Sequence, residues 1–369
     1  MNSHGRDLRA TRTDMRATRR PVAAAILALG FGLAITWVPW LCGAGADVPT
    51  GRVELPSVLA SAAEMPQPAE AARRAGPVVG VGEQKPQMFA SAPWKRLGLR
   101  DARYTAPWDA LEDPSQLALL DAWMAAARQA RVRVLLGFAH SLRTATLART
   151  LPTQRQFERQ FKRFRKRYPW VRDWLAWNEA NHPGALTETR PRRAAQYFDA
   201  VARNCRGCRV VAADVLDTRN MTWWVTRFRR YARSTPKIWG LHNYGDANGL
   251  KVRSTPRLLA ITRGKIWFTE TGGVVLRRDY RGRKVLRTYR YSLRHAAAST
   301  KHALKLSCLS RRITRIYLYH WQPPWKVTNW DSGLVDRRGR PRPAFTVVRR
   351  WLNKATRASR RGARRALCR

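Results

Sequence analysis

Two glutamates stand near the ends of apolar segments in this 369-residue chain and could form a catalytic pair. Glu179 lies in the run WLAWNEA at 174–180, and Glu270 lies in KIWFTET at 265–271. Two carboxyl groups about 5–5.5 Å apart can cleave a glycosidic bond with retention, because one attacks the anomeric carbon while the other protonates the leaving oxygen and then activates water. A lone glutamate in so basic a chain would be read as a salt-bridging residue. Two in matched positions favour the catalytic interpretation.

The elements that would position this pair form a repeating pattern. Short apolar runs rich in Val, Ile, Trp and Tyr are typical of parallel strands covered on both faces. There are eight of them, at 78–83, 102–108, 131–140, 174–180, 209–217, 238–245, 265–271 and 315–322. Helical periodicity occupies 115–129, 154–168, 192–204 and 288–305. The alternation predicts a (β/α)8 TIM barrel over residues 77–353.

A doubly wound open sheet is the rival fold. It would usually carry a glycine-rich phosphate turn after the first strand, and GEQKP at 82–86 does not match that turn. In a barrel, function lies at the carboxyl ends of the strands. Acids, amides, imidazoles and indoles gather at these predicted ends, namely Glu83, Trp108, His140, Asn178, Glu179, Asp214, His242, Asn243, Tyr244, Glu270, His320 and Trp321.

Several of these motifs carry a family resemblance. WNEAN at 177–181 resembles the motif that ends strand four in clan A, the large clan of retaining (β/α)8 glycoside hydrolases that includes endoglucanases and β-xylosidases. TETG at 269–272 resembles the strand-seven nucleophile motif, HNY at 242–244 the strand-six motif, and Trp321 the strand-eight indole. The stretch DSGLVD at 331–336, followed by PRPAF, is similar to the end of bacterial members. The resemblance covers about residues 78–352 in the right order.

The resemblance implies a role for each matched residue. Glu179 would be the acid/base and Glu270 the nucleophile, while Asn178 would bind the sugar 2-hydroxyl. We expect burial beside Trp174 and Trp177 to raise the pKa of Glu179. Tyr244 would donate a hydrogen bond to Glu270, His242 would bind substrate, and Trp321 would form an apolar floor beneath the sugar ring.

Other candidates rest on position alone. Arg103 is expected beneath Glu270 as an ion-pair partner, with a structural role as the alternative. His140 and His182 would line the cleft, or be structural histidines. Three tryptophans are candidates for outer subsites, namely Trp108, Trp325 and Trp330, although a barrel with 16 tryptophans must bury many of them.

The sequence favours neither a metal nor a cofactor. Four aspartates would be the candidate ligands, namely Asp214, Asp217, Asp246 and Asp331. Their placement on separate loops favours helix caps and ion pairs over a cation site.

Residues 1–46 resemble an export signal. An uncharged run of about 21 residues at 21–41 follows a cluster of arginines and precedes Ala44-Gly45-Ala46. A cleaved signal peptide and a retained membrane anchor both fit, and both would place the rest of the chain outside the cytoplasm. Residues 47–76 are read as a linker of low order, and 354–369 as a basic tail.

The net charge of +47 results from 71 Lys+Arg against 24 Asp+Glu. Specific nucleic-acid binding is not expected, since the basic residues are spread along the chain and no nucleic-acid-reading motif is found. Compositional bias is one explanation. Attraction to an acidic polysaccharide, an anionic cell-wall surface or an anionic membrane is the other.

The five cysteines include a C-x-x-C at Cys205 and Cys208. No second pair exists to complete a zinc site, so we expect a small loop disulfide, as suits an exported chain. The sequence thus predicts a secreted or membrane-anchored glycosidase acting on an oligo- or polysaccharide. The competing hypothesis is a non-catalytic barrel that binds a glycan or wall polymer at the cell surface.

Overall fold

The computed structural model describes residues 76–281, 284–325, 329–360 and 364–368. The segments predicted as export signal and linker therefore lie outside the described residues, apart from Gly76. Among the helices of the described part, none combines the length and apolar character needed to cross a bilayer.

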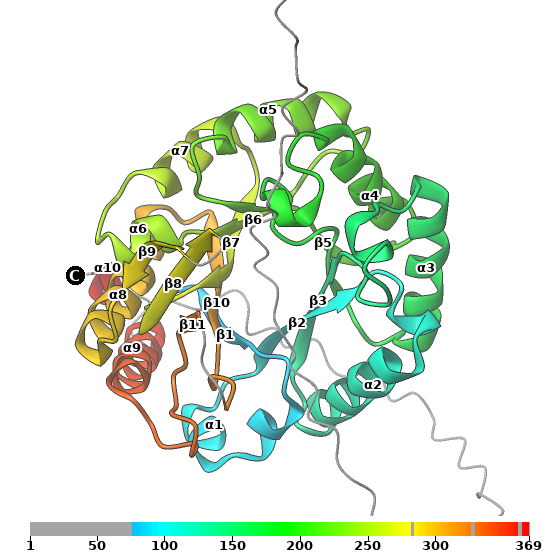
Figure 1. Cartoon of the computed structure of the whole chain (residues 1–369). Helices are drawn as coiled ribbons and strands as arrows, with labels where there is room; N and C mark the ends of the chain where they lie inside the picture. The colour runs from blue at the N-terminus through cyan, green and yellow to red at the C-terminus, as the bar shows by residue number, and fades with distance from the viewer. Residues whose placement is uncertain (1–75, 282–283, 326–328, 361–363, 369) are drawn as a thin grey trace, which may run out of the picture.

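Eight parallel strands close into a barrel in the order β1-β10-β7-β6-β5-β4-β3-β2, and helices surround it (Figure 1). The barrel strands are β1 Val78–Gly82, β2 Asp101–Pro107, β3 Arg133–Ala139, β4 Asp173–Leu175, β5 Arg209–Leu216, β6 Ile238–His242, β7 Lys265–Thr271 and β10 Ile313–Tyr319. All eight predicted strands are present, and the (β/α)8 prediction is confirmed.

The surrounding helices are α1 Ala92–Leu97, α2 Pro114–Gln129, α3 Gln154–Arg167, α4 Pro191–Arg203, α5 Met221–Tyr231, α6 Tyr244–Asn248, α7 Ser254–Ile261, α8 Leu293–Leu306, α9 Pro343–Arg360 and α10 Arg364–Cys368. Short 3-10 helices are η2 Pro86–Ala90, η3 Ala110–Glu112, η4 Leu147–Arg149, η5 Pro183–Ala185 and η6 Ser307–Leu309. Local sequence explains the boundaries of several. Helix α2 starts at a proline after Asp113, whose carboxylate accepts hydrogen bonds from two backbone amides, and α3 starts with a capping box between Thr153 and Gln156.

The interior of the barrel is a packed core. A separate cluster of buried side chains fills it, namely Leu135, Leu175, Val211, Ile238, Trp267 and Tyr317. The larger apolar cluster lies between the strands and the helices, where Phe138, Phe161 and Trp174 contact one another through their rings. This filling leaves the carboxyl ends of the strands as the place for function.

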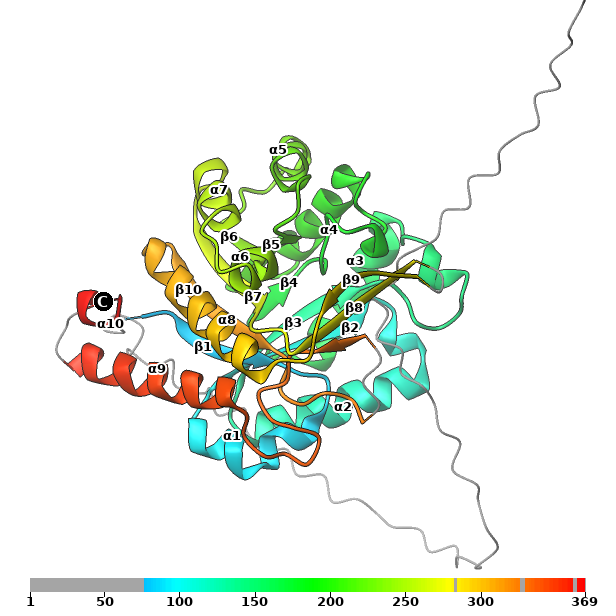
Figure 2. The ribbon, with the colours of Figure 1, turned by 60° about the vertical axis from the view of Figure 1, so that its left-hand side comes forward.

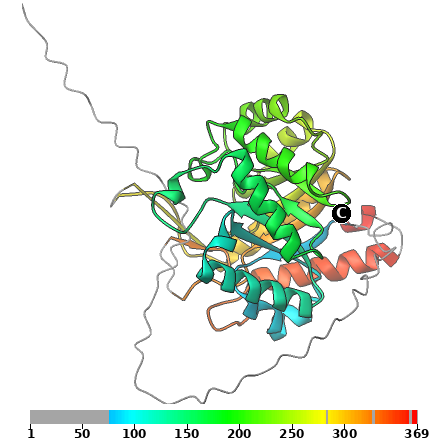
Figure 3. The same ribbon diagram turned by 90° about the vertical axis from the view of Figure 1, so that its right-hand side faces the viewer.

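A second sheet was not predicted. Strands β8 Leu276–Arg281 and β9 Lys284–Tyr289 form an antiparallel hairpin, and β11 Trp330–Asp331 pairs with β8. The hairpin projects from the barrel (Figures 2 and 3). The predicted helix at 288–305 therefore begins later, at Leu293, where the Ser292 side chain accepts a hydrogen bond from the His295 amide.

The boundary predicted at residue 353 does not coincide with a structural boundary. Helix α9 continues through it to Arg360, with Ala358 buried. Leu367 is also buried, and Cys368 forms a disulfide with Cys308. Nothing in the sequence indicated this pairing, because the two cysteines lie 60 residues apart. The expected disulfide between Cys205 and Cys208 is present.

Candidate active site

The two predicted catalytic glutamates meet at one end of the barrel. Glu270 is the penultimate residue of β7, and the register of the sheet pairs it with His242, the last residue of β6. Glu179 lies four residues beyond β4. One oxygen of each carboxylate and the His242 imidazole lie within 4.8 Å of one another. The two carboxylates are close enough to flank one glycosidic bond, as the two carboxyl groups of retaining glycosidases do at about 5–5.5 Å.

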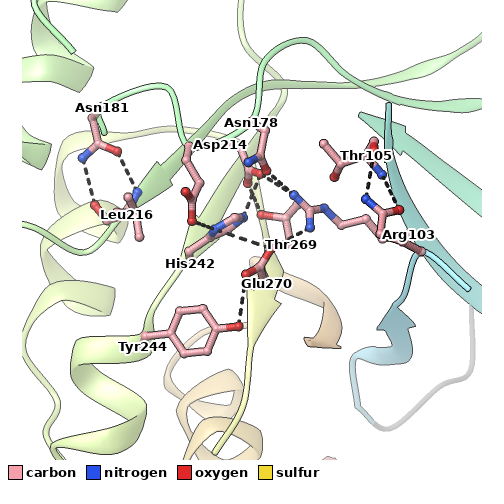
Figure 4. Close-up of polar contacts among 12 residues, drawn as sticks. Arg103, Thr105, Asn178, Asn181, Asp214, Leu216, His242, Tyr244, Thr269 and Glu270 are labelled. Atoms are coloured by element: carbon pink, nitrogen blue, oxygen red, sulfur yellow. Dashed lines mark hydrogen bonds and ion pairs between the residues drawn. The ribbon is translucent and has the colours of Figure 1, made fainter. Parts of the chain in front are cut away.

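Neighbouring strands hold the loop that carries Glu179. The amide of Asn178 donates to the Phe138 carbonyl at 2.7 Å, and that of Ala180 donates to the Asp214 carbonyl at 2.7 Å. Glu179 has φ of 46°, in the left-handed region that is uncommon for a residue with a side chain. Asn181 fixes the next turn, since its side chain bonds both the amide and the carbonyl of Leu216 (Figure 4).

Glu270 is held from both sides. Arg103 on β2 donates through Nη1 to Oε2 at 2.7 Å, and Tyr244 donates its hydroxyl to Oε1 at 3.1 Å. The guanidinium also bonds Asp214 at 3.1 Å and the side-chain oxygen of Asn178. The structure thus places Arg103, Asn178 and Tyr244 in one network around Glu270, as Figure 4 shows.

Asp214 joins this network at its centre through an ion pair with Arg103, one of the roles expected of the four aspartates from the sequence. It is fully buried on β5 and bonds His242, Arg103 and Thr269. A Cβ at Gly240 would lie 2.3 Å from an Asp214 oxygen and 2.8 Å from the Thr269 hydroxyl oxygen. Because glycine has no Cβ, Gly240 leaves the space in which the side chains of Asp214 and Thr269 contact each other.

His242 connects the two carboxylates that flank it. Its Nδ1 lies 3.0 Å from Glu179 Oε1, and its Nε2 lies 2.8 Å from Asp214 Oδ2. Burial alone would lower the pKa of His242, but the charges of Asp214 and Glu270 and the hydrogen bonds to Asp214 and Glu179 raise it to about 10. The ring is therefore an imidazolium at neutral pH, with a proton on each nitrogen.

The pKa of Glu179 differs from the expectation. Burial raises it, but the hydrogen bond and the positive charge of His242 outweigh burial and leave the pKa below its ordinary value. Trp174 and Trp177 are not the cause of any rise, because both pack outward. Trp174 contacts Phe161, and Trp177 contacts Tyr197 in α4.

The predicted aromatic floor is in a different place. Trp321 is 2% exposed, and its ring meets Trp94 of α1 at 5.8 Å and Phe345 of α9 at 6.3 Å, so it belongs to the helix layer. Strand β10 ends earlier, at Tyr319. Burial is the main cause that raises the pKa of Tyr319, and the charges of Glu270 and Glu83 add to it.

The remaining candidates are distributed around the site. Trp330 meets Tyr244 ring to edge at 5.0 Å, and Arg277 of the hairpin lies over Trp330, so the hairpin contacts the site. His140 follows β3, and burial lowers its pKa. His182 caps η5 and accepts a hydrogen bond from Gly184. Trp325 is 77% exposed, whereas Trp108 is buried.

Glu179, His242 and Glu270 are also a donor set that could hold a metal ion. Two features argue against this use. The oxygen Oε2 of Glu270 already accepts from Arg103 at 2.7 Å, and the raised pKa of His242 keeps a proton on the nitrogen that would coordinate the ion. The four aspartates considered earlier do not converge either. Asp246 and Asp217 accept backbone amides, and Asp331 pairs with Arg342.

Comparison with known proteins supports the fold. No family model and no curated protein matches the sequence. Among solved structures, a GH5_18 enzyme from Streptomyces cattleya in complex with GlcNAc is 14% identical, with a TM-score of 0.54 over 78% of this chain and 81% of that one. The chain has the barrel fold of glycoside hydrolases.

Two further solved structures share the fold of this chain. A family 39 glycoside hydrolase from Bacteroides cellulosilyticus is 13% identical, with a TM-score of 0.51 over 74% of this chain and 63% of that one. A calcium-binding mutant of Bacteroides uniformis beta-glucuronidase 2 is 12% identical, with a TM-score of 0.52 over 74% of this chain. This chain spans about a third of the length of that glucuronidase, since it covers 34% of it.

Proposed function

We propose that the protein is a glycoside hydrolase that cleaves a β-linked glycan by double displacement with retention. The observation that carries the proposal is the position of Glu179 and Glu270, whose oxygens approach within 4.8 Å across a network that orients both. The solved neighbours with the same barrel are glycoside hydrolases, which agrees with it.

In the first step Glu270 attacks the anomeric carbon, while Glu179 protonates the departing oxygen. Arg103 and Tyr244 each donate a hydrogen bond to one oxygen of Glu270, which fixes the direction of the nucleophile. The side-chain oxygen of Asn178 accepts a hydrogen bond from Arg103. The side-chain nitrogen of Asn178 would then donate a hydrogen bond to the sugar 2-hydroxyl.

In the first step the acid form of Glu179 gives its proton to the leaving oxygen, and the His242 imidazolium, 3.0 Å away, stabilises the carboxylate that results. In the second step this carboxylate removes a proton from water as the glycosyl–Glu270 bond breaks, which restores the acid form of Glu179. Asp214, at 2.8 Å from Nε2, holds the ring in place throughout.

We propose Tyr319, rather than Trp321, as the aromatic group beneath the sugar. It ends β10 at the mouth, next to Glu270, whereas Trp321 is packed between α1 and α9.

We also propose that the protein works outside the cytoplasm, secreted or held by its N-terminal segment. Two disulfides lie within the described part of the chain, and disulfides persist in oxidising compartments. Fractionation of cells that express the full chain tests this proposal. Recovery of the protein in the cytoplasmic fraction with its cysteines reduced would contradict it.

The catalytic proposal is tested by hydrolysis of a panel of aryl β-glycosides and soluble polysaccharides. Glu179→Gln and Glu270→Gln are expected to lose turnover on every substrate that the wild type cleaves, while Glu188→Gln, a control on the same loop, retains it. No turnover by the wild type, together with glycan binding that is unchanged in both variants, would favour the binding barrel instead.

A further inference from the structure

A hollow lies between helices α4 and α5 on the outside of the barrel, apart from the catalytic network. Its volume is about 410 Å³. The residues that line it are Thr189, Arg190, Pro191, Arg192, Arg193, Gln196, Trp223, Arg227 and Tyr231. The two helices run side by side in Figures 1 and 2. Because each helix follows its strand, α4 begins at the end of the barrel that carries Glu179.

Positive charge is concentrated in this hollow. Four of the described lining residues are arginines and none is acidic. Arg190, Arg192 and Arg193 stand at the start of α4, where the positive end of the helix dipole adds to the positive potential. Arginine is the side chain best suited to binding carboxylates, since its planar group donates two parallel hydrogen bonds.

Two large aromatic rings are exposed in the same hollow. Trp223 is 47% exposed and Tyr231 is 43% exposed. With Arg227 they occur every fourth residue along α5, so they form one row in which the rings are about 12 Å apart along the axis. The Arg227 guanidinium lies 5.7 Å from the centre of the Trp223 ring. Along this row of α5 an aromatic ring, a positively charged guanidinium and a second aromatic ring therefore follow one another.

Helix α3 shows that basic charge alone does not produce this arrangement. Its outer face also lines a hollow, formed by Arg155, Glu158, Arg159, Lys162, Arg163 and Lys166. That row contains no aromatic residue, and Glu158 lies within 4 Å of both Lys162 and Arg203. The α3 face is an ordinary basic helix surface, whereas the described lining of the α4/α5 hollow combines arginines with exposed rings and contains no acid.

We propose that the α4/α5 hollow is a second glycan-binding site, which takes a polysaccharide that carries carboxylate groups, such as a polyuronide. The C–H faces of the sugars would pack on Trp223 and Tyr231, and the carboxylates would pair with Arg192 and Arg227. At protein–protein interfaces, tryptophan, tyrosine and arginine are the residues that most often dominate the binding energy. The inference rests on the proposed function only for the choice of a glycan as ligand.

A binding experiment with polygalacturonate tests the proposal. The full chain carrying Glu270→Gln is titrated with polygalacturonate at about 0.15 M salt, where long-range attraction between exposed charges is largely screened. Adding Trp223→Ala and Tyr231→Ala together is expected to weaken binding on the order of tenfold, equivalent to about 1.4 kcal/mol. The matched control, Arg159→Ala with Lys162→Ala on α3, is expected to change binding by less than about twofold.

Two results would overturn the proposal. One is binding of polygalacturonate that is equally tight with and without the two aromatic rings. The other is displacement of polygalacturonate by polyphosphate or double-stranded DNA at equal charge concentration, which would show that net charge alone attracts the polymer. The variant that carries both Trp223→Ala and Tyr231→Ala is expected to melt at the wild-type temperature, because both side chains are exposed.

The outcome is separable from that of the proposed function. In the chain with Glu270 intact, Trp223→Ala is expected to hydrolyse a short aryl glycoside at the wild-type rate, because the row lies outside the barrel mouth. If no glycoside is hydrolysed but polygalacturonate binding still depends on Trp223, the proposed function fails and the second site stands.

Discussion

The Nδ1 atom of His242 lies 3.0 Å from Oε1 of Glu179, while its Nε2 lies 2.8 Å from Asp214. The imidazole therefore lies between the carboxylate that we propose as the acid/base and one that is fully buried. A positively charged ring can donate a hydrogen bond to both, and it explains why the pKa of Glu179 is lowered although partial burial raises it.

This relationship predicts how stability changes with pH. The pKa of His242 in the folded protein is raised to about 10, above its ordinary value of about 6.5. The stabilisation is therefore complete below about pH 6.5 and is lost as pH rises toward 10. Wild type should lose its advantage in free energy of unfolding over His242→Gln across this range, as measured by urea unfolding. An advantage that stays constant would contradict the charged imidazole.

His140 provides a control of opposite sign. Burial lowers its pKa, so the unfolded chain binds the proton more readily. Wild type should then lose stability relative to His140→Gln as pH falls below about 6.5, rather than as it rises. The same urea series measures both variants.

Tyr244→Phe removes the hydroxyl that donates to Glu270 at 3.1 Å. A hydrogen bond to a charged group contributes about 1.5–3 kcal/mol, so kcat/KM should fall roughly tenfold to a hundredfold. Tyr104→Phe is the matched control. Tyr104 is a buried tyrosine on β2, and its ring packs on Trp123 of α2 at 4.9 Å between ring centres. Equal losses of kcat/KM in the two variants would contradict a specific role for Tyr244.

Trp321 and Tyr319 should respond differently to truncation. Trp321→Ala leaves a cavity between α1 and α9 and should cost about 3–5 kcal/mol of unfolding free energy, while the folded fraction keeps its KM. Tyr319→Ala should instead raise KM or lower kcat. Denaturant unfolding and steady-state kinetics on both variants measure this, and a Trp321→Ala enzyme with normal stability but impaired KM would restore the sequence-based assignment.

The Cys308–Cys368 disulfide links η6 to the last helix and closes a loop of 60 residues. Replacing both cysteines by serine should lower the free energy of unfolding by about 2–4 kcal/mol. Replacing Cys205 and Cys208, which are three residues apart, should cost less because their loop is short. Chemical denaturation of the two double variants checks the order, and a larger loss for the short loop would contradict it.

The strands were predictable because each is an almost unbroken apolar run between helices, and each has a fixed place in a closed barrel. The hairpin of β8 and β9 was not, since its residues are mostly charged and polar and adjoin a helical pattern. Its pairing with β11, about 50 residues further along the chain, leaves no local signal.

The meeting of Glu179 and Glu270, with most of the side chains around them, could be predicted from the ends of the strands, but the places of two residues could not. Asp214 was noticed as a strand-end residue, yet its pairing with His242 and Arg103 depends on how three strands align around the barrel. Trp321 was assigned to the mouth because the strand was extended to 322. It ends at Tyr319, and the indole turns toward the helices.

The most direct test of the account is to trap the glycosyl–enzyme intermediate. A 2-deoxy-2-fluoro glycoside of the sugar that the panel identifies is incubated with the wild type, and the digested protein is analysed by mass spectrometry. We predict one covalent sugar on the peptide that contains Glu270, and none in Glu270→Gln. A label on Glu179, or no label together with a first-formed product of inverted anomeric configuration, would contradict double displacement through Glu270.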